Sequence, residues 1–192
     1  MRDSVFTVEL CLRLDLAPFV LDQLRPCVQA APERVTRDEA WRRHAGAAEI
    51  LMQHLPNAER GCWEYFDDQT TARAMFDDWC RPVLDRVLPR TEPSGIPDFR
   101  NAGARYLLFT FVYLLARDSP SDLAVRRACD VPEGNLWKRA TFRRLLGTVR
   151  SLSFASVKSD CIYMTPRDHD WSLTASDLAE SKYQYLRPID GQ

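Results

Sequence analysis

Three groups of side chains in this sequence could carry chemistry, and the first is an acidic loop that contains a histidine. Asp168, His169 and Asp170 place two carboxylates beside an imidazole, a combination that can bind a metal ion or tune a general base. Three successive residues of one loop rarely converge on a single ion, and the other histidines, His44 and His54, offer no suitably spaced partner. We therefore predict no metal site and interpret the segment as a solvated turn before a helix.

The second group is a cysteine with a distant histidine, which could serve as nucleophile and base of a hydrolase. Cys62 lies in Gly61–Trp63, a segment similar to the nucleophile region of cysteine hydrolases, and His169 would be the base. A nucleophilic cysteine should stand at a helix N-terminus, where the dipole lowers its pKa. Cys62 is instead followed by the bulky run Trp63–Phe66. A cysteine hydrolase is thus the third hypothesis, after two binding functions, and no catalytic residue is predicted.

The third group is a concentration of basic residues in the last third of the chain, opposed nearby only by Asp130 and Glu133. On a helix, Arg139, Arg143 and Arg150 would share one face. Guanidinium groups arranged in this way can grip phosphates or an acidic protein surface. An ordinary solvated face, paired with the chain's own acids, is the alternative. The predicted anion-binding or partner-binding patch comprises Arg126, Arg127, Arg139, Arg143, Arg144 and Arg150.

Two tryptophans stand outside the regular apolar patterns. If Trp137 and Trp171 are exposed, they indicate a contact surface; burial in the core is the open alternative. The chain has no GxSxG, Walker or GxGxxG motif, so no cofactor is predicted.

Composition is that of an ordinary globular protein. The 192 residues are 45% hydrophobic and 28% charged, and we predict a single domain that spans residues 1–192. The net charge of −1 excludes a protein-wide electrostatic attraction to nucleic acid or to acidic membranes. The apolar run Tyr106–Ala116 is about half of what spans a bilayer. We expect a soluble, cytoplasmic protein with no membrane partner.

The six cysteines are expected to be reduced core thiols. A surface loop or linker is predicted near 89–103, where prolines cluster.

The periodicity of apolar residues predicts strands and helices in alternation. Val5–Leu14 alternates with period two, which predicts a half-exposed strand. Tyr106–Leu115 is apolar on both faces, as in a central strand, and Phe154–Met164 forms a further strand. The segment 62–66 fits either a strand or a helical turn. Helices are predicted at 19–32, 36–55, 71–88, 119–129, 139–149 and 173–178.

This order of elements predicts an α/β (mixed α+β) fold. The connection from the Tyr106 strand to the Phe154 strand is long enough for a helical crossover, which favours parallel pairing. We therefore predict a small, mostly parallel or mixed sheet of about three or four strands covered by helices.

The C-terminal third resembles an uncharacterised family of cyanobacterial, plastid and other bacterial proteins. In that family a strand ends in a Trp-Thr-Pro-Gln-like motif, followed by an acidic turn, a short helix and a Tyr-Pro-x-Leu tail. The matching segments are Tyr163–Pro166, Asp168–Asp170, Leu173–Leu178 and Tyr185–Pro188. Met164 and Arg167 replace the family's Trp and Gln. The resemblance implies a soluble domain of this fold, with no activity or catalytic residues.

Taken together, these observations favour a non-catalytic interaction, accessory or regulatory module that binds an acidic protein surface. The alternative is binding of nucleic acid or a phosphate ligand through the arginine-rich helix.

Overall fold

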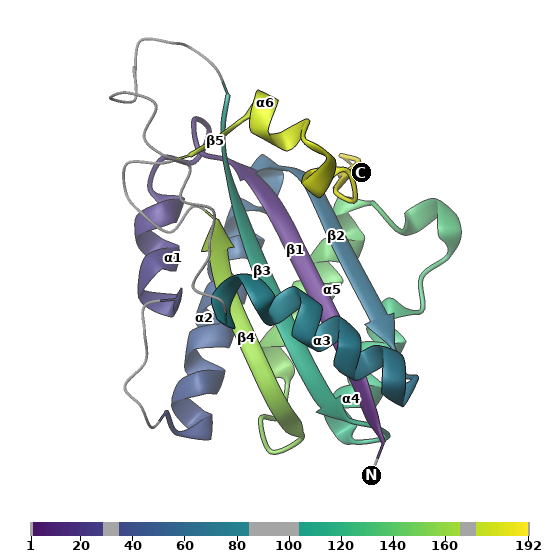
Figure 1. Ribbon diagram of the computed structural model, residues 1–192. Helices are drawn as coiled ribbons and strands as arrows, with labels where there is room; N and C mark the ends of the chain where they lie inside the picture. The colour runs from purple at the N-terminus through teal and green to yellow at the C-terminus, as the bar shows by residue number, and fades with distance from the viewer. Residues whose placement is uncertain (1, 29–34, 85–103, 166–171, 192) are drawn as a thin grey trace.

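The computed structural model describes residues 2–28, 35–84, 104–165 and 172–191, and it has a single antiparallel sheet at its centre (Figure 1). Within these ranges the sheet has six strands in the order β4-β3-β1-β2-β6, with β5 pairing to β3. The strands are β1 (Asp3–Arg13), β2 (Ala58–Phe66), β3 (Arg105–Ala116), β4 (Val157–Thr165), β5 (Leu173–Thr174) and β6 (Arg187–Pro188). The mixed α/β class is confirmed, whereas the predicted parallel or mixed sheet of three or four strands is wrong.

Helices cover both faces of the sheet. One face carries α1 (Val20–Val28), α2 (Arg37–His54), α4 (Pro120–Cys129) and α5 (Arg139–Ser151). The other carries α3 (Gln69–Leu84) and the C-terminal segment with α6 (Ala175–Leu178). Short 3-10 turns lie at Leu55–Asn57, Glu133–Asn135 and Ser181–Tyr183. No helix of the described ranges is long and apolar enough to cross a membrane.

The connection between β3 and β4 explains the error about parallel pairing. A single helix would carry the chain across the sheet and return it parallel, but here α4 and α5 pack against each other. The start of α4 meets the end of α5, where Ser121 Oγ donates to the Ser153 carbonyl at 3.1 Å. The chain therefore re-enters the sheet at the end that it left, and β4 runs antiparallel to β3.

Strand β1 is buried on both faces, so the predicted half-exposed strand is wrong. Its even-numbered residues from Phe6 to Leu12 join the core under α1, α2, α4 and α5. Its odd-numbered residues face α3 and the C-terminal segment, and even Glu9 is 2% exposed. Glu9 is buried because the Thr110 hydroxyl and the Tyr185 hydroxyl both donate to its carboxylate. The polar residue Glu9 therefore marks a buried hydrogen-bonded group rather than an exposed face of β1.

Local signals located several elements correctly. Thr36 and Glu39 form the capping box that starts α2, and the Ser119 hydroxyl caps α4. The capping box at Thr174 is also present, although α6 has only 4 residues. The ambiguous segment 62–66 is part of β2, and the predicted strand at Phe154 begins at Val157. The predicted loop at 89–103 lies outside the described residues.

Candidate binding site

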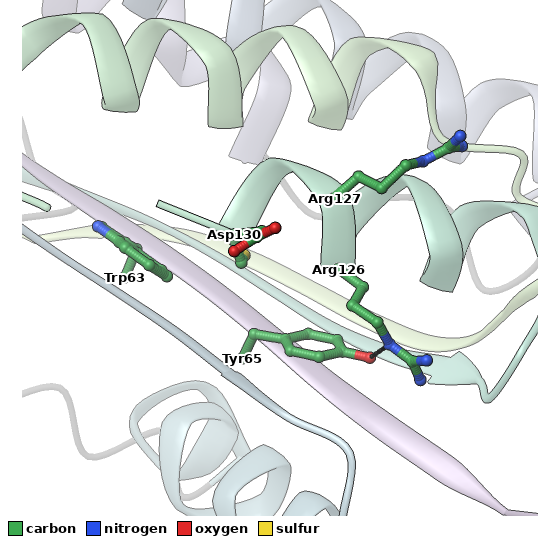
Figure 2. Close-up of a pocket in the computed structure, with 6 residues that line it drawn as sticks. Trp63, Tyr65, Arg126, Arg127 and Asp130 are labelled. Atoms are coloured by element: carbon green, nitrogen blue, oxygen red, sulfur yellow. Dashed lines mark hydrogen bonds between the residues drawn. The ribbon is translucent and has the colours of Figure 1, made fainter. Parts of the chain in front are cut away.

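A pocket of about 510 Å³ lies between strand β2 and helix α4 (Figure 2). Aromatic rings of β2 form one wall, and arginines from the last turn of α4 form the other. The lining residues are Trp63, Tyr65, Arg126, Arg127, Cys129 and Asp130. The site therefore contains two of the six arginines predicted to bind an anion or partner.

Strand geometry brings the two aromatic side chains to one face. Trp63 pairs with Val8 and Tyr65 with Phe6, and both of these β1 residues lie on the face covered by α4 and α5. Trp63 is fixed at its polar end, because its Nε1 donates to the Leu136 carbonyl at 2.9 Å. Its ring also lies 6.5 Å from that of Trp137, centroid to centroid. The aromatic wall is thus held in place before any ligand arrives.

A buried carboxylate organises the other end of the pocket. Asp122 is 0% exposed and accepts a hydrogen bond of 2.7 Å from the Tyr65 hydroxyl. Arg126 Nε donates to the Tyr65 oxygen at 3.3 Å. Burial raises the pKa of Tyr65 to about 12, so this hydroxyl stays protonated at neutral pH. The guanidinium of Arg126 also lies 3.4–3.5 Å from the carboxylates of Asp67, Asp118 and Asp122.

Two further arginines near the pocket carry charges that no described acid neutralises. Arg127 is exposed, and its Nε donates to the Leu123 carbonyl of its own helix at 3.2 Å. Arg144 reaches from α5 to the Asp130 carbonyl at 3.3 Å. Its charge also acts on Cys129, although burial dominates and raises the pKa of that thiol to about 12. Arg127 and Arg144 are therefore the cations that remain for a ligand at this pocket.

The rest of the predicted arginine patch is divided rather than gathered. Arg150 forms an ion pair of 2.6 Å with Glu49. Arg139 is half-buried, and its Nη2 donates to the Pro56 carbonyl at 3.5 Å. Arg143 is exposed and, among the described residues, has no ion-pair partner. Among the described residues, the structure thus pairs Arg150 with an acid of another helix and leaves Arg139, Arg143 and Arg144 of α5 without an ion pair.

Trp137 is half-buried and packs against the main core, close to Trp63. Trp171, the Asp168–Asp170 segment and with it His169 lie outside the described residues. Within the described ranges, no group of three His, Cys, Asp or Glu side chains could hold a metal ion.

The geometry around Cys62 does not suit a nucleophile. Cys62 lies in the middle of β2, on the sheet face opposite the pocket, and packs under the C-terminal segment. Burial, with a smaller contribution from the nearby carboxylates of Glu64 and Glu9, raises the pKa of this thiol to about 12. A thiol in this environment is uncharged at neutral pH, whereas a nucleophile needs the thiolate.

Comparison with protein-family models, with curated proteins and with solved structures found no match. The resemblance of the C-terminal third to an uncharacterised family therefore stays a prediction. The site is defined by its geometry alone.

The pocket includes aromatic residues that the sequence did not single out. Trp63 and Tyr65 lie in the segment that fitted either a strand or a helical turn, so no face could be assigned to them. If the segment is taken as a strand, Trp63 and Tyr65 point to one side and Cys62 and Glu64 to the other. Two large aromatics on one side of the strand were the available signal for this wall; α3 and β3 lie between β2 and α4 in the chain, so the opposing arginines depend on the tertiary fold.

Proposed function

We propose that this protein is a non-catalytic binding module whose pocket between β2 and α4 receives an acidic segment of a protein partner. The observation that carries the proposal is that two aromatic rings, Trp63 and Tyr65, line a pocket together with Arg127, which has no described carboxylate partner. Arg144, bonded to the carbonyl of the lining residue Asp130, lies nearby. Flat rings can pack against apolar atoms of a ligand, and Arg127 and Arg144 can pair with its carboxylates. The cavity volume is within the range of ordinary ligand sites.

The arginines of the pocket have different tasks. Arg126 is occupied by three acids and by Tyr65, so it holds the wall in position rather than offering a free charge. Arg127 is exposed at the mouth of the same pocket and is bonded only to a main-chain carbonyl. A carboxylate that approaches Arg127 displaces no existing ion pair among the described residues. The binding energy should therefore depend strongly on Arg127.

The groups that line the pocket favour binding over catalysis. Tyr65 and Cys129 both have pKa values raised to about 12 by burial, so neither supplies an anionic nucleophile at neutral pH. Asp130 is the pocket's one carboxylate, and it has no described general base or nucleophile beside it. A non-catalytic role is the function that this set of groups supports best.

Nucleic acid is the second candidate, because aromatic rings next to arginines can stack bases and hold phosphates. Acidic residues stand against it: Asp67, Asp118 and Asp130 surround the pocket and would repel a polyanion such as a nucleic-acid backbone. A short carboxylate-bearing segment brings less charge and can place it at Arg127. We therefore favour an acidic protein segment.

Fluorescence anisotropy with defined probes tests the proposal. An end-capped octapeptide alternating Glu and Val should bind, and its Gln-Val counterpart should bind at least about tenfold more weakly, because it loses charge-assisted hydrogen bonds. Arg127→Ala should weaken binding of the acidic peptide about tenfold or more. Arg42→Ala, which removes an exposed arginine of α2 outside the pocket, is the matched control and should change little.

Two results would overturn the proposal. Equal affinity for the Glu-Val and Gln-Val peptides would show that the arginines do not select carboxylates. Binding of a 20-nucleotide single-stranded RNA, with an affinity lost in Arg127→Ala, in place of the peptide would assign the pocket to nucleic acid.

A further inference from the structure

The outer edge of β2 is open beside the pocket. β1 pairs with β2 along its length, from Leu12 opposite Ala58 to Val5 opposite Phe66. On the other side, β6 pairs only with Arg60 and Gly61. Within the described part of the chain, residues 62–66 have no strand partner on this outer side. A free edge of this kind is a template for an added strand.

The backbone groups that face this edge belong to the residues that line the pocket. Ile189 N donates to the Glu59 carbonyl at 2.9 Å, so Glu59 points its polar backbone groups outward. Because outward and inward groups alternate along a strand, Gly61, Trp63 and Tyr65 also point outward. Among the described contacts, the outward backbone groups of Trp63 and Tyr65 make one, in which the Trp63 N–H donates to the neighbouring Cys62 thiol. The edge therefore offers both donors and acceptors.

The side chains of a strand added at this edge would face two different surfaces of the protein. Alternate side chains would lie on the face of Trp63 and Tyr65, where Arg127 also lines the pocket, with its guanidinium extending away from the two rings (Figure 2). The intervening side chains would lie on the opposite face, where Trp79 donates to Glu64 and packs edge-on against Tyr185. The first set meets cations and the second meets aromatic rings. A segment that alternates acidic and apolar residues complements both faces.

The opposite edge of the sheet, formed by β4, has features that disfavour the addition of a strand. Strand β4 carries Lys158 and Asp160 on its exposed outer part. Lys158 forms an ion pair with Asp3, and Asp160 accepts from His44 Nε2 at 2.7 Å. β4 also has a register irregularity opposite Leu114 and Leu115. Charged side chains and bulges of this kind discourage strand addition, so the two edges are not equivalent.

We infer that the acidic partner segment binds as an additional β-strand along the Trp63–Tyr65 edge of β2, with alternate acidic side chains directed toward Arg127. This inference rests on the proposed function, because it specifies how the same pocket takes its partner. Main-chain hydrogen bonds to β2 supply affinity in this mode, and the side chains on the pocket face supply selectivity. The occupant is an extended segment of a protein that alternates acidic and apolar residues.

Backbone methylation of the peptide tests strand addition without any change to the protein. Two variants of the Glu-Val octapeptide are compared with the parent, one N-methylated at two central Glu residues and the other at two central Val residues. In a strand, only one of these sets has its N–H groups toward β2. One variant should therefore bind about tenfold or more weakly while the other retains the affinity of the parent. The set that loses affinity identifies the direction of the added strand.

The outcomes separate the two proposals. Equal affinities of the two methylated peptides, whether both strong or both weak, would overturn strand addition. If the parent peptide binds and is sensitive to Arg127→Ala, the proposed pocket would survive that result. No binding of the parent would overturn both. If the protein dimerises in sedimentation experiments and does not bind the peptide, the β2 edge would be the site of a second copy of the chain, and the inference would be overturned.

Discussion

Replacement of Asp122 by asparagine should destabilise the protein far more than its small chemical change suggests. The Asp122 side chain is 0% exposed and receives donors from several directions. Ser4 Oγ donates at 2.5 Å and the Tyr65 hydroxyl at 2.7 Å, both to Oδ1. The Asp118 amide donates to Oδ2 at 2.8 Å, and Arg126 lies 3.5 Å from the same oxygen. This carboxylate connects β1, β2 and α4 beneath the pocket.

An asparagine amide retains one acceptor oxygen and presents an NH₂ group in place of the other. At least one donor would then face another donor, and one of the three carboxylates around Arg126 would lose its charge. Loss of a hydrogen bond to a charged, buried group costs about 1.5–3 kcal/mol, and Asp122 accepts several such bonds. The ion pair with Arg126 contributes less, because that side chain is 39% exposed. We expect Asp122→Asn to lower the free energy of unfolding by about 3 kcal/mol, which lowers the urea midpoint by about 1 M or more.

Urea titration followed by circular dichroism and tryptophan fluorescence measures this effect. Asp118→Asn is the matched control: the Asp118 side chain is 70% exposed and lies 3.5 Å from the same arginine. Its φ of 62° is left-handed, a conformation that asparagine adopts readily. The control should change the free energy of unfolding by less than about 1 kcal/mol. Similar losses for the two variants, or a loss below about 1 kcal/mol for Asp122→Asn, would refute the assigned role of the carboxylate.

Three further predictions concern the core and the second face of the sheet. Gly61→Ala would place a methyl group 2.7 Å from a ring carbon of Phe142 and 2.9 Å from the Glu9 carbonyl oxygen. This overpacking should lower the free energy of unfolding by about 2–3 kcal/mol in urea titrations, and adding Phe142→Leu should recover part of the loss. An unchanged urea midpoint would contradict the close packing at Gly61. Because the pKa of the Cys62 thiol is about 12, iodoacetamide at pH 8 should alkylate Cys62 much more slowly in the native than in the urea-unfolded protein, as peptide mass spectrometry can measure; equal rates would show that the thiol is not buried. Burial raises the pKa of Glu9 above its ordinary 4.5, so the stability it contributes is complete below pH 4.5 and is lost as pH rises through the folded-state pKa. Glu9→Gln should therefore become progressively more stable relative to the native protein above pH 4.5 in urea titrations, and a pH-independent difference would rule out this linkage.

Local features of the sequence were sufficient to locate many elements. Thr36 with Glu39 predicted the start of α2, because a capping box depends on residues three apart in the chain. Tyr106–Leu115 predicted a central strand, because a strand covered on both faces needs apolar residues on both. These predictions need no knowledge of what packs against the element.

Features that depend on distant partners were predicted poorly. Glu9 indicated an exposed face, because its partners Thr110 and Tyr185 lie far along the chain. The direction of β4 depends on how α4 and α5 pack, which their own sequences do not specify. Helical phase predicted that Arg139, Arg143 and Arg150 share a face, but the pairing of Arg150 with Glu49 of another helix could not be read from it. Helical phase shows which residues share a face and says nothing about which of them are already paired.

The central claim is that the pocket between β2 and α4 binds an acidic segment, and the indole N–H resonances of the tryptophans test it most directly. In ¹⁵N–¹H spectra recorded during titration with the Glu-Val octapeptide, we predict that the Trp63 indole resonance shifts. The Trp41 indole, which donates to the Arg150 carbonyl away from the pocket, should not move. Arg127→Ala should strongly reduce the Trp63 shift at the same peptide concentration, because it weakens binding of the peptide. A shift at Trp41 with none at Trp63, or a Trp63 shift that persists unchanged in Arg127→Ala, would contradict the claim.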